Sequence, residues 1–174
     1  MSGVVSLLLI GVILTAAAVA QESALKETNR ALAQGFVYFT DSQGFWLKSE
    51  TIRLPSGLDA HQTGKQIVLK LIEGPSGTGL VRLWPEKTHL NAFFITDDSR
   101  AVVDLDIPET TGHGGRGMDT RKEMLVLYSL VNSLTVNIPQ VKSVKILIRG
   151  KDARTIGGHL DADFFYTTNM LIVK

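Results

Sequence analysis

The clearest pattern of hydrophobic and polar positions lies between residues 120 and 150. Apolar residues recur there at alternating spacings of three and four, which is typical of one face of an amphipathic helix. These residues are Met124, Leu127, Val131, Leu134 and Ile138. Thr120 and Glu123 have the spacing of a capping box, so the pattern predicts a helix start at Thr120. Pro139 ends the helix, because proline cannot donate the next helical hydrogen bond.

A strand is expected directly after this proline. Val144, Ile146 and Ile148 alternate with Ser143, Lys145, Leu147 and Arg149. This alternation predicts a strand with one buried face and one mostly solvent-exposed face. A helix whose apolar face packs on a sheet forms a core, and this unit contains no catalytic group.

Shorter aromatic or alternating runs predict the remaining elements. Strands are expected near residues 36–41, 45–54, 90–95 and 101–106, a further helix between about residue 60 and Gly74, and a closing strand or tail over 164–173. The order is then β-β-α-β-β-α-β plus a C-terminal strand or tail. Tight turns between consecutive strands favour antiparallel pairs. The sequence therefore predicts an α+β fold in which two helices pack on one face of an antiparallel or mixed sheet.

The first 21 residues differ from the rest of the chain. Gly3–Ala20 carries no charge, and eighteen helical residues rise about 27 Å, close to the roughly 30 Å hydrocarbon core of a bilayer. The run predicts an uncleaved membrane anchor or a secretory signal peptide cut after Ala20, with a buried soluble helix as the least favoured alternative. Residues 22–34 are polar and are expected to form a linker. Residues 35–174 then form a single domain.

Composition excludes several classes of function. Eighteen basic residues nearly balance 17 acidic ones, which gives a net charge of +1 and no electrostatic reason to expect nucleic acid binding. The chain has no cysteine, so disulfides, thiolate metal sites, a cysteine nucleophile and a lipid-modified cysteine are all excluded. We expect no cofactor and no enzymatic activity.

A glycine-rich loop over residues 112–117 is the best chemical candidate. The backbone N–H groups of Gly114 and Gly115 can form an anion-binding nest, and Arg116 can add a bidentate contact to a carboxylate or phosphate. The loop lacks the spacing of a phosphate-binding P-loop, so a plain surface connection is the alternative.

Other polar and aromatic residues are weaker candidates. His159 with Asp161 and Asp163 suggests a metal or a general base, but a turn held by local hydrogen bonds explains the same residues. Asp104 and Asp106 fit the solvent face of a strand, and His61 and His89 fit surface or boundary positions. Trp46 and Trp84 are candidate interaction anchors, because tryptophan is enriched at interface hot spots.

Several stretches, taken in order, resemble the GerMN domain of envelope and spore-germination-type proteins. These stretches are Val37–Phe39, Leu71–Pro75, Val103–Leu105, Leu127–Leu130, Val141–Gly150 and Gly157–His159. The resemblance implies an anchored or exported, non-enzymatic binding or assembly module, with a fold like the small α/β modules that build rings in secretion machinery. It supplies no catalytic or ligand-binding residue.

Two hypotheses of function follow. The first is a non-catalytic, membrane-tethered or exported binding and assembly module of the bacterial cell envelope. Its partners would be envelope proteins or other copies of itself in the membrane plane. The second is an envelope hydrolase or small-anion-binding protein that uses the loop at residues 112–117. Both place the domain on the extracytoplasmic side of the cell membrane, or in the periplasm after cleavage.

The N-terminal run generates a direct prediction of topology. Because Gly3–Ala20 is apolar and long enough to span a bilayer, we expect the full-length protein in the membrane or exported fraction of a cell lysate. Recovery in the soluble cytoplasmic fraction would contradict this expectation. N-terminal sequencing separates the two forms, since cleavage gives a mature protein that begins at Gln21.

Overall fold

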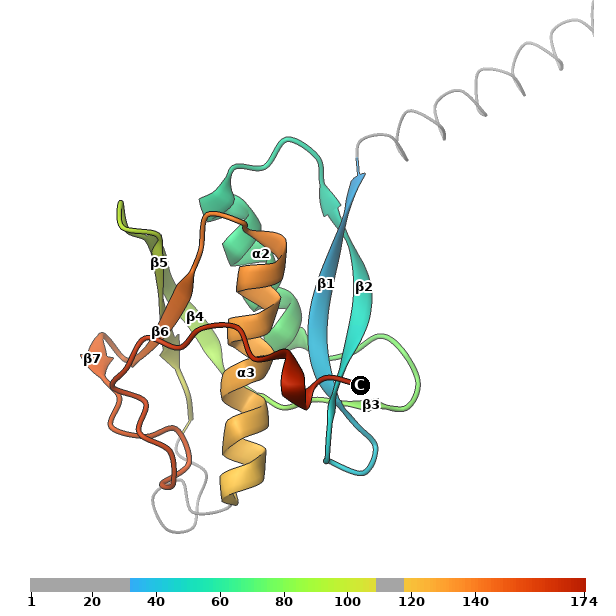
Figure 1. Cartoon of the computed structure of the whole chain (residues 1–174), viewed down its shortest axis with the longest axis vertical. Coiled ribbons are helices and arrows are strands. Elements are labelled where there is room, and N and C mark those ends of the chain that lie inside the picture. Colours follow the sequence, from blue (N-terminus) through green and yellow to red (C-terminus); the bar gives the residue numbers. More distant parts are fainter. Residues whose placement is uncertain (1–31, 109–117) are drawn as a thin grey trace, which may run out of the picture. The chain divides into compact units, whose positions relative to one another are not determined.

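Helix α3 (Thr120–Asn137) is the central element of the chain (Figure 1). Ten of its residues are buried, and they do not form a single stripe. Val131 and Leu134 of the predicted apolar face are fully buried, but so are Leu125 and Leu130 outside it. The amphipathic pattern therefore identified the helix but underestimated how much of its circumference is covered.

The computed structural model describes residues 32–108 and 118–174, which fall into two units. The larger unit comprises Gln34–Ile52 and Leu58–Lys174. Of the smaller unit only residues 32–33 and 53–57 are described, at the ends of β1 and β2. Strand β1 begins at Leu32, inside the predicted linker. No helix of the described residues is long and apolar enough to cross a membrane, and the predicted anchor at Gly3–Ala20 lies outside them.

The strands form two separate sheets. The elements are β1 (Leu32–Asp41), β2 (Leu47–Pro55), α2 (Ala60–Glu73), β3 (Leu80–Val81), β4 (His89–Ile95), β5 (Arg100–Asp106), α3, β6 (Ser143–Ile148), β7 (Lys151–Asp152) and the 3-10 turn η1 (Met170–Ile172). The first sheet has the order β2-β1-β3 and the second the order β4-β5-β6-β7. This architecture confirms the α+β class. It also shows that the strands are divided between two sheets, where the sequence analysis assumed one.

The second sheet is mixed. Strand β4 pairs with β5 antiparallel, as the tight turn between them predicted. Strand β6 pairs with β5 in parallel, because the chain crosses back through α3 before it enters β6. Helix α2 packs against β4 and α3 against β6, and both helices lie on the same side of this sheet (Figure 1).

Helix α2 shows how closely a helix approaches this sheet. Asp59 caps it and forms a capping box with Gln62. Gly64 lies directly under the ring of Phe93 in β4, where an added Cβ would fall 2.2 Å from the ring carbons. The Nε2 of His61 donates to the carbonyl of Phe93 at 2.5 Å. The glycine therefore sets the distance between α2 and the sheet.

Polar side chains of α3 contact the backbone of β1, in the other sheet. Ser129 donates to the carbonyl of Tyr38 at 2.6 Å, and Ser133 accepts from the N–H of Tyr38 at 3.0 Å. Asn137 accepts from the N–H of Phe36 at 2.9 Å and donates to its carbonyl at 2.6 Å. Steps of four residues on a helix and two on a strand bring these groups together. These side-chain hydrogen bonds take the place of a neighbouring strand, because β3 pairs with β1 only at Thr40 and Asp41.

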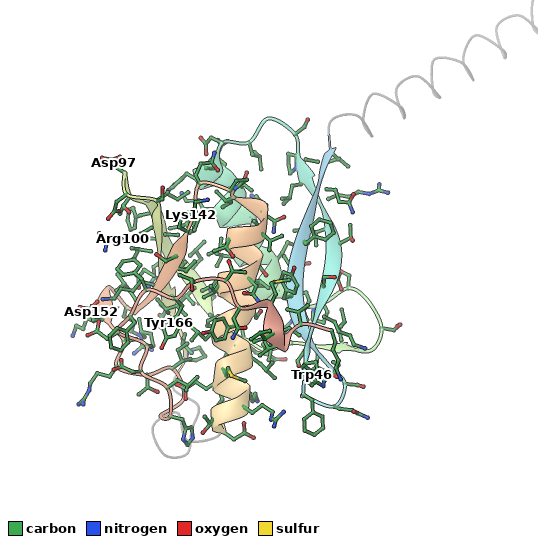
Figure 2. The ribbon with its side chains drawn as sticks, viewed as in Figure 1. Trp46, Asp97, Arg100, Lys142, Asp152 and Tyr166 are labelled. Carbon is green, nitrogen blue, oxygen red and sulfur yellow. The ribbon has the colours of Figure 1, made fainter. Side chains whose placement is uncertain are left out.

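Residues 163–174, here called the C-terminal strap, join the two sheets across α3 (Figure 1). Tyr166 exchanges two backbone hydrogen bonds of 2.8 Å with Val144 of β6. The N–H of Lys174 donates to the carbonyl of Leu47 in β2 at 2.9 Å. Figure 2 shows Tyr166 near α3, and Trp46 lies at the other end of the strap, 4.1 Å from Lys174 Nζ. The predicted closing strand is thus an extended segment that makes isolated bridges.

The middle of the strap is held by one buried side chain of α3. The amide of Asn132 donates to the carbonyl of Asn169 at 2.8 Å and accepts from its N–H at 2.9 Å. Asn132 is fully buried. A carboxamide can satisfy one backbone donor and one acceptor at once, which explains a polar residue at this depth.

The contact between α3 and β1 yields a prediction of stability. Ser133→Ala leaves the buried N–H of Tyr38 without an acceptor, and we expect a loss of about 1–3 kcal/mol in the free energy of unfolding. The higher helix propensity of alanine offsets a small part of this loss. Urea denaturation followed by circular dichroism measures the change. Ser49→Ala, at an exposed position of β2, is the matched control, and equal midpoints for the two variants would contradict the prediction.

Candidate functional site

The glycine-rich loop proposed as an anion site lies outside the described residues. Gly114, Gly115 and Arg116 all fall within residues 109–117. The loop ends next to Met118, directly before the first turn of α3. Its ligand-binding role stays a prediction from the sequence.

The two tryptophans occupy different environments. Trp84 is 2% exposed, and its indole N–H has no hydrogen-bond partner within the part of the chain that is described. A side chain buried this deeply offers no surface to a partner protein. Trp46 is half-buried under Lys174, so of the two it alone keeps a face that a partner can reach.

The remaining polar candidates are engaged in local contacts. Asp161 accepts from the N–H of Asp163 at 2.9 Å, and His159 is exposed. Asp104 accepts from the N–H of Gly150 at 2.8 Å, and Asp106 pairs with Arg149 at 2.6 Å. Across residues 32–108 and 118–174, no group of three or more His, Cys, Asp or Glu side chains is placed to hold a metal ion.

The most unusual polar group is the carboxylate of Glu123, for which the sequence predicted a role in a capping box. Glu123 is 1% exposed and accepts five hydrogen bonds from the loop after β7. Its Oε1 accepts from Thr155 Oγ1 at 2.7 Å and from the N–H groups of Ile156 and Gly157 at 2.9 and 2.7 Å, and its Oε2 accepts from those of His159 and Leu160 at 2.8 and 3.0 Å. The carboxylate therefore organises a loop that has no regular secondary structure.

The predicted capping box at Thr120 and Glu123 is wrong. Asp119 is the N-cap of α3, and its side chain accepts from the N–H of Lys122 at 2.7 Å. Glu123 is thereby free to turn toward residues 155–160. Sequence spacing fits both arrangements equally well, and only the tertiary fold brings the loop within reach of the carboxylate.

The glycines of this loop have a packing role. A Cβ at Gly157 would fall 2.9 Å from the Cβ of Met118 and 3.3 Å from the carboxyl carbon of Glu123. Gly158 adopts a positive φ of 103°, which most other residues avoid. Gly157–His159, one of the stretches that carried the family resemblance, is thus part of a structural site around Glu123.

Hydrogen bonding outweighs burial in setting the charge of Glu123. Burial raises the pKa of this carboxyl, whereas the hydrogen bonds from Gly157, Thr155, Leu160 and His159 lower it, and the net pKa lies below the ordinary value of 4.5. Glu123 is therefore ionised at neutral pH in the folded protein.

One broad surface of the described chain is left uncovered by helices. The inner side chains of the mixed sheet, such as Val103 and Ile146, are fully buried under α2 and α3. The opposite side, here called the open sheet face, consists of Ala92, Phe94, Val102, Asp104, Lys145 and Leu147. In one row across this face Phe94 lies beside Val102, and Val102 beside Lys145. Phe94 is 54% exposed, which makes it the apolar centre of the face.

The edge of the open sheet face carries charges. Lys145 lies 2.7 Å from Asp152 and 2.8 Å from Asp163, and these two carboxylates together raise the pKa of its ammonium. The centre of the Phe165 ring lies 4.6 Å from the guanidinium carbon of Arg100. An apolar centre bordered by charged groups is the composition of a surface that contacts another protein.

A second exposed surface lies on α2. Its outward-facing side chains, here called the outer α2 face, are Gln62, Lys65, Gln66, Leu69 and Glu73. Leu69 is 47% exposed in the middle of this polar row. The two surfaces are of complementary kinds, since an exposed helix with one apolar anchor can pack on an uncovered sheet.

Comparisons with known proteins agree with this fold. The family model Germane, described as sporulation and spore germination, matches residues 36–154. A candidate lipoprotein from Clostridium perfringens is 22% identical over 79% of this chain and 88% of its own, with a TM-score of 0.53. The first GerMN domain of the sporulation protein GerM from Bacillus subtilis is 20% identical over 76% of this chain and 97% of its own, with a TM-score of 0.58.

The tandem GerMN domains of GerM give a TM-score of 0.59 at 20% identity, with 77% of this chain aligned to 46% of that one. This chain therefore spans about half of the tandem structure. A search of curated proteins found no match. At these identities the solved structures establish the fold alone, and with the family model they confirm the resemblance to GerMN domains.

The Glu123 site gives a prediction that depends on pH. Glu123→Gln replaces one acceptor oxygen by an NH2 group facing loop N–H donors, and we expect a loss of about 2–5 kcal/mol in the free energy of unfolding at pH 7. Because the folded-state pKa is below the unfolded one, the wild-type carboxylate contributes stability above its unfolded pKa. This contribution disappears as the pH falls through the folded pKa.

The difference in stability between the wild type and Glu123→Gln should therefore become smaller as the pH falls below the ordinary glutamate pKa. Thermal denaturation of both proteins over a pH series measures it. Glu73→Gln is the control, since the Glu73 side chain is 64% exposed and pairs with Lys70 at the surface. A gap that does not change with pH would contradict the role of the ionised carboxylate.

Proposed function

The chain belongs to the Germane family of sporulation and spore-germination domains, and we propose that it is a non-catalytic, membrane-tethered or exported binding and assembly module of the bacterial cell envelope. The observation that carries this proposal is the open sheet face, centred on Phe94 and uncovered by α2 and α3. A sheet that buries one side under two helices and leaves the other partly apolar is suited to contact another protein.

The occupant that we propose for the open sheet face is the outer α2 face of a second copy. Leu69 would pack against the exposed Phe94 and the half-buried Val102, which lie side by side on the open sheet face. Lys65 on the helix would approach Asp104 on the sheet, so the charges also match in sign. Such a contact joins two different surfaces, and contacts of this kind repeat from copy to copy into a ring or a filament.

Membrane attachment allows copies of the domain to assemble through a weak contact of this kind. The apolar run Gly3–Ala20 supports tethering or export, and a candidate lipoprotein among the structural neighbours agrees with an envelope location. Copies confined to a plane have a high effective concentration, so that individually weak contacts can hold an assembly together. The same domain without its N-terminal run should associate weakly in dilute solution.

The polar candidates that the structure describes are engaged in contacts within the fold, which fits the non-enzymatic role that we propose. Glu123 is committed to its loop, Asp104 and Asp106 to β-sheet contacts, and His61 to the carbonyl of Phe93. The alternative function, a hydrolase or small-anion-binding protein using residues 112–117, depends on a loop outside the described part of the chain. No contact that the structure does describe favours it.

Cysteine cross-linking tests the assembly contact directly, because the chain has no cysteine of its own. One population of full-length protein carries Leu69→Cys and another carries Phe94→Cys, and the two are mixed in the same membrane. We expect disulfide-linked dimers only in the mixture, since the contact joins one surface to the other. Replacing Phe94→Cys by Leu171→Cys, at a position that is 89% exposed on the strap, provides the matched control.

Three further outcomes bear on this prediction. Alanine at His113 and Arg116 should leave the cross-linking unchanged, and its loss would favour the anion-binding alternative. Cross-links of equal yield in the mixture and in the control would refute the proposed surfaces. A tight oligomer of the fragment that starts at Glu22, seen by analytical ultracentrifugation, would contradict the weakness of the contact.

A further inference from the structure

A cleft of about 300 Å³ with a mixed polar and apolar lining lies away from the two assembly surfaces. It is bounded by the turn between β1 and β2, by β3 with the residues that follow it, and by the first turn of α3. Its polar lining includes Thr40, Asp41, Gln43, Arg82, Asp119 and Lys122. The volume is at the lower end of the range for sites that hold small ligands.

The wall formed by the β1–β2 turn is fixed by Asp41. Its Oδ1 accepts from the N–H of Phe45 at 2.9 Å and from that of Trp46 at 3.4 Å. The N–H of Gly44 donates to the carbonyl of Asp41 at 3.0 Å, and Gly44 has a φ of 73° that suits glycine. The turn is therefore held in one conformation before any ligand arrives, which lowers the entropic cost of binding.

The charge of Asp41 has no direct counterion among the described residues. The residue is 9% exposed, and no cation of the described chain lies within ion-pair distance of its carboxylate. The hydrogen bond from Phe45, with smaller effects from Trp46, Gly44 and Lys48, holds its pKa below the ordinary value against the opposing effect of burial. A nearly buried, ionised carboxylate on the wall of a cleft is a binding group for a cation.

The opposite charge comes from α3. Lys122 lines the cleft, and its ammonium has no ion-pair or hydrogen-bond partner among residues 32–108 and 118–174. The guanidinium of Arg82 adds positive charge, although it already donates to the carbonyl of Glu73. Val81, Leu83 and Leu125 supply apolar surface between these groups. The cleft is thus lined by two acidic residues, Asp41 and Asp119, and by two basic ones, Arg82 and Lys122. Asp119 is the N-cap of α3 and accepts from the N–H of Lys122, so Asp41 and Lys122 are the acidic and basic side chains without an ion-pair partner among the described residues.

We propose that this cleft binds a small zwitterion of the amino-acid type. The ammonium group of the ligand pairs with Asp41, its carboxylate pairs with Lys122, and a short side chain rests on the apolar surface of Val81 and Leu125. The preference for both charges follows from the lining, because a ligand with one charge leaves one protein group without its counterpart. Ligand binding here is independent of assembly, which uses the open sheet face and the outer α2 face.

Nuclear magnetic resonance of the 15N-labelled full-length protein tests the proposal with L-threonine as the probe. We expect saturable shifts of the backbone amides of Gly44, Phe45 and Lys122. N-acetyl-L-threonine lacks the ammonium charge and L-threoninamide lacks the carboxylate, so each should bind at least about tenfold more weakly. This pair of analogues separates recognition of a zwitterion from attraction to a single charge.

Matched variants locate the site. Asp41→Asn and Lys122→Gln should each weaken L-threonine binding by about tenfold or more, while Lys65→Gln on the outer α2 face should bind as the parent does. If Asp41→Asn disturbs the turn, the exposed Lys122→Gln variant decides the question. Absence of saturable shifts, equal binding of the three compounds, or undiminished binding by Lys122→Gln would each overturn the proposal.

Discussion

The fold depends on one constraint, which is that the buried helix α3 must satisfy the backbone of segments that lack a partner strand. Its polar side chains do so in three places. Ser129, Ser133 and Asn137 serve β1, Asn132 serves the C-terminal strap, and Glu123 serves the loop over residues 155–160. Each unmade hydrogen bond in a buried position is costly, so these residues fix where the segments lie.

This arrangement explains why the domain needs little regular structure around α3. Strand β3 and strand β7 have two residues each, and the strap makes only isolated bridges. Side chains of the helix replace the hydrogen bonds that longer strands would have made. The family match ends at residue 154, whereas the loop held by Glu123 and the strap held by Asn132 lie beyond it.

The same packing decides which side of the mixed sheet is buried and which side is exposed. Helix α2 covers β4, and α3 contacts β6 as well as β1 of the other sheet. Both helices therefore lie on one side of the mixed sheet. Phe94 and Val102 are left on the other side, where neither α2 nor α3 covers them. The surface available to a partner is thus a consequence of how the core is filled. The charged cleft near Asp41 arises separately, from the way the β1–β2 turn meets the start of α3.

Local sequence determined the elements and much of the core. The three-and-four spacing in α3 and the alternation in β6 each act over a few residues, so the sequence predicted the α+β class and the order of the longer elements correctly. The two-residue strands β3 and β7 were not predicted. The family resemblance was also available from short stretches such as Val141–Gly150. The long-range partners of polar residues were not available, because spacing along the chain carries no information about distant segments.

Glu123 shows this limit most directly. Three residues after Thr120 it fits a capping box, and only the tertiary fold brings residues 155–160 to its carboxylate, more than 30 positions along the chain. Ser129, Asn132 and Ser133 gave no signal in a pattern based on apolar positions. Trp84 was a candidate interaction anchor because tryptophan is enriched at interfaces, but packing places it in the interior. The sequence determined which elements form, and the tertiary structure decided which polar groups they satisfy, because hydrogen bonds between distant segments exist only after the core has formed.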